Sequence, residues 1–278
     1  FKVVLTGEGA DEIFWGYPHL RRDWFSATMP AGPAREQALG LLARQNQASA
    51  GIMMPDEAQV SLGSVRQALG AVPAWVLAKA QLGRRHQPVL SREFRDRYAG
   101  IDPFAALLAR FDVAGQLVGR HGVDQAAFLW TRLALANYIL KTLGDGTEMA
   151  HSVEGRVPFL DHQLAEWALR LPPDARIRGA VEKAVLRDAV RQLVPESIRT
   201  RPKHPFLAPP VSLFSSPRSR ALVQDVLRSQ AFGSVPFFDR ARTMRWLDEL
   251  PRLSERERAA RDPVLMTALC ACVLQERF

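Results

Sequence analysis

A short apolar run near the start of the chain leads directly into a glycine-flanked acidic segment. Residues 3–5 are Val-Val-Leu, residues 6–9 are Thr-Gly-Glu-Gly, and a helix is expected from about Ala10. An unalternating apolar run is typical of a buried parallel strand, and such sheets bind ligands at the carboxyl ends of their strands. Glycines let a ligand approach the backbone, and the N–H groups of a helix start attract anions. The segment predicts either a ligand-binding turn or a tight turn in which Thr6 and Asp11 only cap the helix.

A second group of charged residues alternates with apolar ones ahead of a proline. Glu154 and Arg156 precede Pro158, and Asp161 stands at the start of an expected helix. Taken alone, this pattern favours a structural role, with Asp161 as the N-cap and a pair between Glu154 and Arg156 holding the loop.

A third group is basic. Lys183, Arg187 and Arg191 follow one another at fourfold spacing. On a helix over residues 180–194 these side chains would share one face. A solvated face is the ordinary meaning of such a stripe, and a phosphate-binding face is the alternative.

The elements that must position these residues are mostly helical. Proline and glycine divide the chain into expected helices at 34–47, 64–82, 101–118, 123–141, 161–171, 180–194, 218–230, 238–250 and 256–277. The helix at 123–141 is apolar on nearly every face, so we expect it to be central and buried. Residues 3–5 form the one recognisable strand. Because a lone strand must pair, and because the chain opens at Phe1 instead of methionine, we expect a fragment whose remaining sheet lies upstream.

Composition excludes several classes of protein. The 278 residues are 47% hydrophobic and 24% charged, as in a globular protein, and they contain no apolar run long enough for a membrane span. A net charge of +8 raises nucleic acid as a partner, but the arginines are scattered beside acidic residues without interleaved aromatics, so nucleic acid is not expected. Cys270 and Cys272 fit neither a disulfide framework nor a zinc site, which favours a reducing, cytoplasmic location. The six histidines show no metal-ligand spacing.

Four motifs, in order along the chain, resemble those of the asparagine synthetase family. Residues 6–17 (TGEGADEIFWGY) resemble its S-G-E-G-A-D-E-L-F-x-G-Y signature. Residues 149–161 (MAHSVEGRVPFLD) look like its M-A-x-S-x-E-x-R-x-P-F-L-D block. Residues 183–187 (KAVLR) and 201–206 (RPKHPF) are similar to its K-x-x-L-R and R-P-K-x-x-F elements.

The resemblance implies an α/β synthetase domain of the PP-loop, adenine nucleotide alpha-hydrolase type, of which residues 1–278 are the C-terminal, mostly helical part. Such an enzyme uses ATP and Mg²⁺ to adenylate a carboxylate, usually that of aspartate. It releases pyrophosphate, and glutamine-derived ammonia then displaces AMP. The family's S-G-G-x-D-S phosphate loop and its glutaminase cysteine do not occur in this sequence. We therefore expect both upstream, and the isolated chain to be inactive.

The resemblance also assigns roles to individual residues. Glu8 matches the carboxylate that supports acyl-adenylate formation and aminolysis, and Lys183 matches the lysine that stabilises charge on the transferring phosphate. Asp11 matches a magnesium and pyrophosphate-side ligand. Glu154, Arg156 and Asp161 are expected to organise the site. The residues that match nucleotide contacts are Thr6, Gly7, Gly9 and Arg187.

Three departures from the family pattern widen the range of substrates. Trp15 and Pro205 each replace a glycine, and residues 144–147 (GDGT) replace a V-D-R-M stretch. They leave room for an amidotransferase that acts on another carboxylate. A relative that closes a lactam with an internal amine is one alternative, although such members carry tyrosine where Glu8 stands. A non-catalytic helical binding module is the alternative from a different class.

Overall fold

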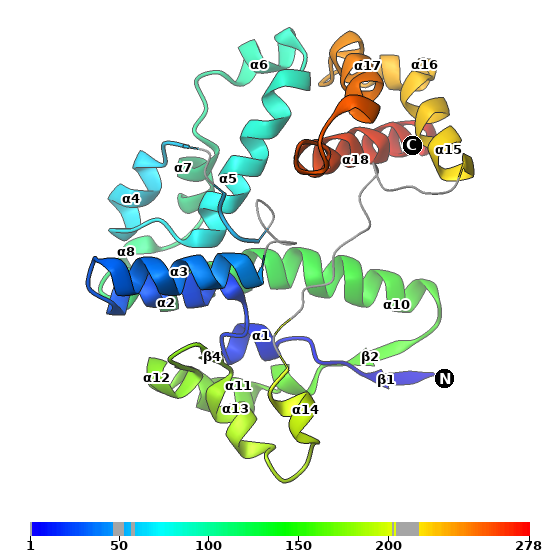
Figure 1. Ribbon diagram of the computed structural model, residues 1–278. Coiled ribbons are helices and arrows are strands. Elements are labelled where there is room, and N and C mark those ends of the chain that lie inside the picture. The colour runs from blue at the N-terminus through cyan, green and yellow to red at the C-terminus, as the bar shows by residue number, and fades with distance from the viewer. Residues whose placement is uncertain (1, 47–52, 57–58, 202, 204–216) are drawn as a thin grey trace.

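The structure of the chain, a computed structural model, describes residues 2–46, 53–56, 59–201, 203 and 217–278. Figure 1 shows a layer of helices crossing the middle of the molecule, with one group of elements below it and two groups of helices above it. Most of the described chain is helical, as predicted.

Two small sheets lie in the lower group. β1 (Val3–Leu5) pairs in parallel with β2 (Glu154–Arg156), and Val4 lies opposite Gly155. β3 (Ile177–Arg178) and β4 (Val181–Glu182) form an antiparallel hairpin. The parallel pairing of residues 3–5 is confirmed, but their predicted burial is wrong, since Val3, Val4 and Leu5 are 41%, 38% and 74% exposed. Among the described residues β1 has only β2 beside it, so its faces are open to solvent.

The other elements of the lower group are short helices. Phe14, at the end of the first of them, packs edge-on against Phe159 with ring centroids 6.3 Å apart. Together with Ile13 and Ala168, Phe14 forms a small separate core. The helices are α1 (Ala10–Ile13), η4 (Pro158–Leu160), α11 (His162–Leu169), α12 (Pro173–Arg176), α13 (Ala184–Ala189) and α14 (Glu196–Arg199). One further short helix, α10 (Thr147–Ala150), lies at the end of the middle layer, from which the chain descends to β2.

The middle layer carries the largest hydrophobic core. The layer consists of α2 (Pro18–Thr28), α3 (Pro33–Gln45), α9 (Gly122–Trp130) and the π-helix η3 (Thr131–Gly146), which continues α9. Trp15, Leu20, Trp75 and Trp130 are among the buried residues of this core.

The two upper groups of helices contact each other, and one of them also packs against α2 of the middle layer. One comprises α4 (Gly63–Leu69), α5 (Ala74–His86), η2 (Gln87–Val89), α6 (Arg92–Tyr98), α7 (Pro103–Leu108) and α8 (Val113–Gln116). The other comprises α15 (Pro217–Arg228), α16 (Gln230–Ser234), α17 (Arg240–Glu249), η6 (Leu250–Arg252) and α18 (Glu255–Arg277), with a core around Leu227, Phe232 and Leu265. Across the described residues, no helix combines the length and apolarity that crossing a bilayer requires.

Several predicted helices match the structure and others do not. Those at 34–47, 218–230, 238–250 and 256–277 are confirmed within a few residues. The helix at 64–82 is two helices, because Gly70 takes a left-handed conformation (φ 78°) ahead of Pro73. The helix at 101–118 likewise divides into α7 and α8. The helix at 123–141 is buried over α9, but in η3 Tyr138 is 57% exposed, so full burial was wrong.

Candidate active site

The turn after β1 requires its second glycine. Gly9 precedes α1 with φ 89°, a left-handed conformation that favours glycine. A Cβ on Gly9 would also lie 2.2 Å from Leu160 Cδ2. Thr6 N–H donates to Arg156 C=O at 2.9 Å, which extends the parallel pairing by one residue. The turn is therefore fixed against η4 and β2, and it holds Glu8 partly exposed at the carboxyl end of β1.

Asp11 is the meeting point of two lysines. Lys183 Nζ lies 2.8 Å from Asp11 Oδ1, and Lys203 Nζ lies 2.8 Å from Asp11 Oδ2. All three side chains are less than one-fifth exposed. Burial alone would raise the pKa of Asp11, but the charges and hydrogen bonds of the two lysines hold that pKa below its usual value. Asp11 is thus a charged carboxylate between two ammonium groups.

Gly16 makes room for this carboxylate. Its N–H donates to Asp11 C=O at 2.8 Å. A Cβ on Gly16 would lie 1.8 Å from Asp11 Oδ1 and 3.0 Å from Lys183 Cε. A side chain at residue 16 would therefore occupy the place where Asp11 and Lys183 meet.

Below Asp11 lies a buried aromatic and acidic cluster that the sequence analysis missed. Glu12 Oε1 accepts hydrogen bonds from Tyr17 OH at 2.8 Å and from Trp130 Nε1 at 3.2 Å. Burial raises the pKa of Glu12 and of Tyr17. His19, fully buried, stacks on Tyr17 and contacts Trp130, and its burial lowers its pKa to about 3. The cluster therefore combines a hydrogen-bonded Glu12, which adjoins Asp11 in the chain, with a neutral, buried histidine.

The prediction of one helix over residues 180–194 with a basic stripe along it is wrong. Val181 and Glu182 form β4, and Lys183 has φ 53°, so the helix begins only at Ala184. The turn at Gly179 (φ 59°) starts a hairpin where helix was expected. Arg187 faces inward, with only 14% of its side chain exposed, and it contacts Glu182.

Arg187 holds two stretches of backbone as well as a carboxylate. Its Nε donates to Glu182 C=O at 2.9 Å, and its Nη2 lies 2.5 Å from Glu182 Oε1. Nη1 also donates to Arg199 C=O, and Nη2 donates to Arg201 C=O at 3.0 Å. The predicted nucleotide contact of Arg187 stays a prediction, and these partners already occupy most of its donors.

Glu154, Arg156 and Asp161 make the structural contacts that the sequence predicted. Asp161 caps α11 by accepting hydrogen bonds from the N–H groups of Gln163 and Leu164. Arg156 Nε lies 2.7 Å from Glu154 Oε1, but both side chains are more than half exposed, so this pair contributes little stability. The unexpected feature is that Glu154 and Arg156 form the strand that pairs with β1.

The structure therefore brings Asp11 and Lys183 together and places Thr6, Gly7, Glu8 and Gly9 in the adjoining turn. Lys203 was missed as a site residue, although it is the lysine of the R-P-K motif. Pro205, one of the departures from the family pattern, and His204 lie outside the described residues.

A carboxylate at Asp11 is chemically suited to bind Mg²⁺, but the described residues supply only part of the ligands that such an ion needs. The described residues contain no group of three or more His, Cys, Asp or Glu side chains placed to hold a metal. Mg²⁺ in nucleotide enzymes commonly takes one or two carboxylates, with phosphate oxygens and water completing its octahedron. One carboxylate at this position fits that arrangement.

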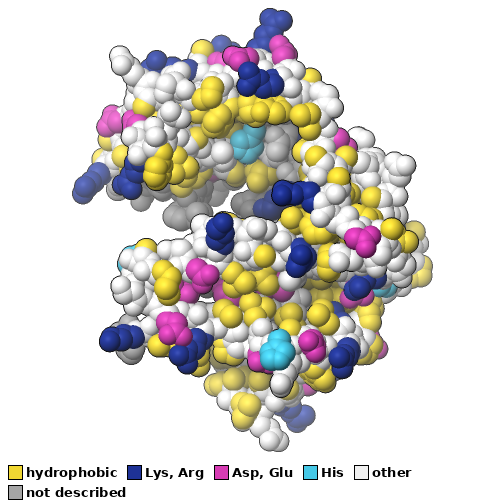
Figure 2. Space-filling view, turned by 180° about the vertical axis from the view of Figure 1, so that it is seen from behind, with side chains coloured by type: hydrophobic (Ala, Val, Ile, Leu, Met, Phe, Trp, Pro, Cys, Tyr) yellow, Lys and Arg dark blue, Asp and Glu magenta, His cyan; other side chains and the backbone are white. Residues whose placement is uncertain are grey.

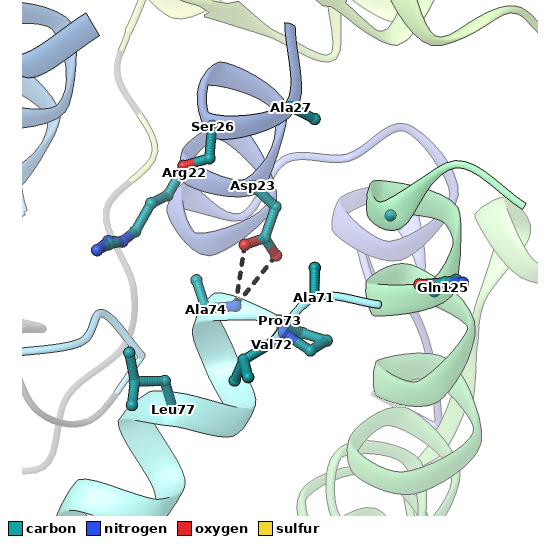
Figure 3. A pocket seen from close by; sticks show the side chains of 11 residues that line it. Arg22, Asp23, Ser26, Ala27, Ala71, Val72, Pro73, Ala74, Leu77 and Gln125 are labelled. Atoms are coloured by element: carbon teal, nitrogen blue, oxygen red, sulfur yellow. Dashed lines mark hydrogen bonds between the residues drawn. The ribbon is translucent and has the colours of Figure 1, made fainter. Parts of the chain in front are cut away.

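A separate cavity of about 200 Å³ opens between α2, α5 and α9 (Figure 3). Asp23 accepts hydrogen bonds there from Ala74 N–H, at 2.9 and 3.2 Å to its two oxygens, and so caps α5 from a neighbouring helix. Burial raises the pKa of Asp23 to about 7. Around it are the small and apolar side chains of Ala27, Ala71, Val72 and Leu77.

Seen from behind, the molecule is hollowed by a recess, and Lys and Arg side chains lie along its edge (Figure 2).

The site thus combines a parallel strand, a glycine-bounded acidic turn and two lysines that meet at one carboxylate. The chain matches the Asparagine synthase family over residues 1–274, so it belongs to that family.

Curated relatives extend this comparison. "Amidase chry2" of Gibberella zeae is 30% identical over 75% of this chain and 32% of its own length. "Putative asparagine synthetase [glutamine-hydrolyzing]" of Mycobacterium tuberculosis is 31% identical over 75% of this chain and 30% of its own length. "Asparagine synthetase [glutamine-hydrolyzing] 3" of Bacillus subtilis is 26% identical over 74% of this chain and 26% of its own length. The chain thus spans about a third or less of these three relatives.

Proposed function

We propose that this chain supplies the helical part of an ATP-dependent amide-forming ligase. The enzyme adenylates a carboxylate with release of pyrophosphate, and ammonia then displaces AMP to give the amide. The observation that carries the proposal is the convergence of Lys183 and Lys203 on Asp11, each at 2.8 Å.

Two cations at one point suit the first half of this reaction. A carboxylate must approach a triphosphate that is also negatively charged, and the charge on the departing pyrophosphate grows as the bond to phosphorus breaks. Ammonium groups held in a partly buried site stabilise that charge more strongly than they would in water. Lys183 and Lys203 can exchange their contacts with Asp11 for contacts with phosphate oxygens, because each is a flexible side chain.

Glu8 suits the second half. Its side chain has no hydrogen-bond or ion-pair partner in the described part of the chain, and it lies in the turn at the carboxyl end of β1. A free carboxylate there can accept a hydrogen bond from ammonia and then take a proton as nitrogen bonds to the acyl carbon. We assign Thr6, Gly7 and Gly9 to backbone contacts with the nucleotide. Asp11 would hold Mg²⁺, which when bound neutralises phosphate charge.

The whole enzyme requires more than this chain. We propose that a PP-loop sheet with its phosphate-binding segment covers the exposed face of β1, and that a glutaminase region supplies ammonia in the cytoplasm. Aspartate is the carboxylate that the asparagine synthetase relatives' names suggest, while the departures at Trp15 and residues 144–147 leave another acid open. Glu8, in place of tyrosine, favours ammonia over an internal amine and so disfavours a lactam product.

Exchange of labelled pyrophosphate into ATP, measured on the full-length protein with a panel of carboxylates, tests the proposal. We expect Lys183→Ala and Lys203→Ala each to reduce exchange by about 10² or more, while glutamine hydrolysis is retained. Lys183→Arg should restore exchange only in part, because a planar guanidinium does not replace a compact ammonium.

The matched control is Lys141→Ala, which removes an exposed lysine on η3 and should leave exchange unchanged. Normal exchange in both lysine variants would mean that the Asp11 cluster is only structural. Absence of exchange with every carboxylate in the unmodified protein would favour the non-catalytic binding module.

A further inference from the structure

Glu182 is a buried carboxylate held between two arginines. Its Oε1 lies 2.5 Å from Arg187 Nη2 and its Oε2 lies 3.2 Å from Arg21 Nη1, with the Glu182 side chain only 5% exposed. Arg21 Nη1 also donates to Ala180 C=O at 2.9 Å. Residues 180 and 182 of the hairpin are therefore both tied to α2, and Lys183 is the next residue along the chain.

Arg187 connects this hairpin to the segment that carries the second lysine. On one side it binds the carboxylate and the carbonyl of Glu182. On the other side it donates to the carbonyls of Arg199 and Arg201. Lys183 directly follows the first of these attachments, and Lys203 comes two residues after the second.

We propose that Arg187 is a positioning residue that sets the places of both lysines at once, by joining the backbone before Lys183 to the backbone before Lys203. This inference rests on the proposed function in one point, namely that the two ammonium groups bind phosphate. It reassigns Arg187 from a nucleotide contact to a residue that acts through its neighbours.

The physical need for such a residue comes from charge and flexibility. Two ammonium groups around one carboxylate repel each other, and both the backbone and the side chain of each lysine lose conformational freedom when the lysine is fixed. Holding the backbone beside each lysine in place supplies the backbone part of that ordering before substrate binds. A planar guanidinium can bind a carboxylate and several carbonyls at fixed angles, whereas an ammonium has only three donors.

The test compares Arg187→Lys and Arg187→Gln in the full-length protein. Arg187→Lys keeps a positive charge beside Glu182, so the fold should survive, but lysine cannot reach the Glu182, Arg199 and Arg201 carbonyls together. We expect both variants to bind inorganic pyrophosphate at least about tenfold more weakly by calorimetry, and to lose kcat for pyrophosphate exchange with little change in the KM for the carboxylate. The matched control is Arg178→Gln, which removes the exposed pair between Arg178 and Asp188 in the same hairpin.

A variant cycle separates positioning from general stability. If Arg187 acts through the lysines, its substitution should have little further effect once both lysines are gone. Adding Arg187→Gln to the Lys183→Ala/Lys203→Ala variant should then weaken pyrophosphate binding by less than about twofold. An equal loss in both backgrounds would overturn the positioning role. So would normal pyrophosphate binding by a folded Arg187→Lys.

These results are distinguishable from failure of the proposed function. If the lysine variants themselves bind pyrophosphate and exchange it normally, the proposed site is wrong. If the lysine variants are impaired and Arg187→Lys is not, only the positioning role is wrong.

Discussion

Lys183 has a left-handed backbone conformation, with φ 53°, immediately before α13. A side chain other than glycine in this region costs about 1 to 2 kcal/mol, so the surrounding contacts must hold it there. The attachments of Glu182 on one side and the start of α13 on the other supply that restraint. The ammonium group is thus directed to Asp11 by the backbone as well as by charge.

The residue with the most specific chemical prediction is Glu8. Glu8→Gln keeps the size of the side chain and its ability to hold ammonia by a hydrogen bond, but an amide cannot take up a proton. With free ammonia supplied to the full-length enzyme, amide product should fall by about 10² or more while the protein stays folded. Amide and AMP are measured together. Unchanged amide formation would leave Glu8 with only a role in the shape of the turn.

Trp15 illustrates a conflict between backbone and packing. It has φ 56°, yet it is 1% exposed and Arg176 lies over its ring at 4.3 Å. Relief of strain in Trp15→Gly would recover about 1 to 2 kcal/mol, but the lost burial costs about 3 to 5 kcal/mol.

We therefore expect Trp15→Gly to destabilise the folded protein by about 1 to 4 kcal/mol, measured by urea unfolding. Trp167→Ala, at a half-exposed position on α11, is the control and should change stability by less than about 1 kcal/mol. Greater stability of Trp15→Gly would show that strain outweighs packing.

At the scale of elements, the sequence predicted what depends on neighbouring residues and missed what depends on distant ones. The helices with caps and an apolar face, such as α18 with its Ser254 and Glu257 capping box, were predicted closely. The hairpin before α13 was missed because Glu182 is held by Arg21, which lies far away in the sequence. The motifs predicted Asp11 and Lys183 as site residues, but spacing could not predict the contacts of Asp11 with Lys183 and Lys203.

The burial of Asp23 beside α5 makes the stability of this junction depend on pH, because it raises the pKa of the carboxyl more than the hydrogen bond from Ala74 lowers it. In the unfolded chain this carboxyl loses its proton near its ordinary pKa of 3.8, whereas the folded protein keeps the proton until about pH 7. The folded state therefore binds more protons between these values. The contribution of Asp23 to the stability of the folded state is therefore greatest below about pH 4, and it falls as the pH rises towards 7.

Asp23→Asn removes this dependence, because an amide does not titrate in this pH range, and its oxygen can still accept the hydrogen bond from Ala74 N–H. We expect the variant to be more stable than the unmodified protein by about 1 to 2 kcal/mol at pH 8, since Asp23 keeps some contact with solvent, and to show little difference at pH 4. Thermal unfolding at both pH values measures this. A difference that does not change with pH would contradict the assignment to Asp23.

At the scale of the whole molecule, the candidate site adjoins an open side of the described structure. The lysines and the acidic turn lie beside a strand whose apolar residues are exposed, and the S-G-G-x-D-S phosphate loop of the family does not occur in the sequence. The family followed from the motifs. The two-stranded sheet, the buried cluster around Glu12 and the contacts of Arg187 did not.

We expect residues 1–278 alone to bind ATP with Mg²⁺ more weakly than the micromolar range and to release no AMP, because the lysines alone do not enclose a triphosphate. Calorimetry of this chain, with the full-length protein as the positive control, measures the difference. Micromolar affinity in the isolated chain would mean that its own residues form a complete nucleotide site.

The contact between Asp11 and Lys183 joins residues 172 positions apart, and β1 pairs with a strand that begins at Glu154. Such distant pairings give a high contact order and slow folding. At about 5 to 20 residues per second, a ribosome that has made Asp11 needs a further 10 to 40 s or so to reach Lys203. During that interval the nascent chain carries the carboxylate without its cations and the apolar strand without its partner. Synthesis thus sets the order of assembly, because Asp11 cannot pair with Lys183 or Lys203 before those lysines have been made.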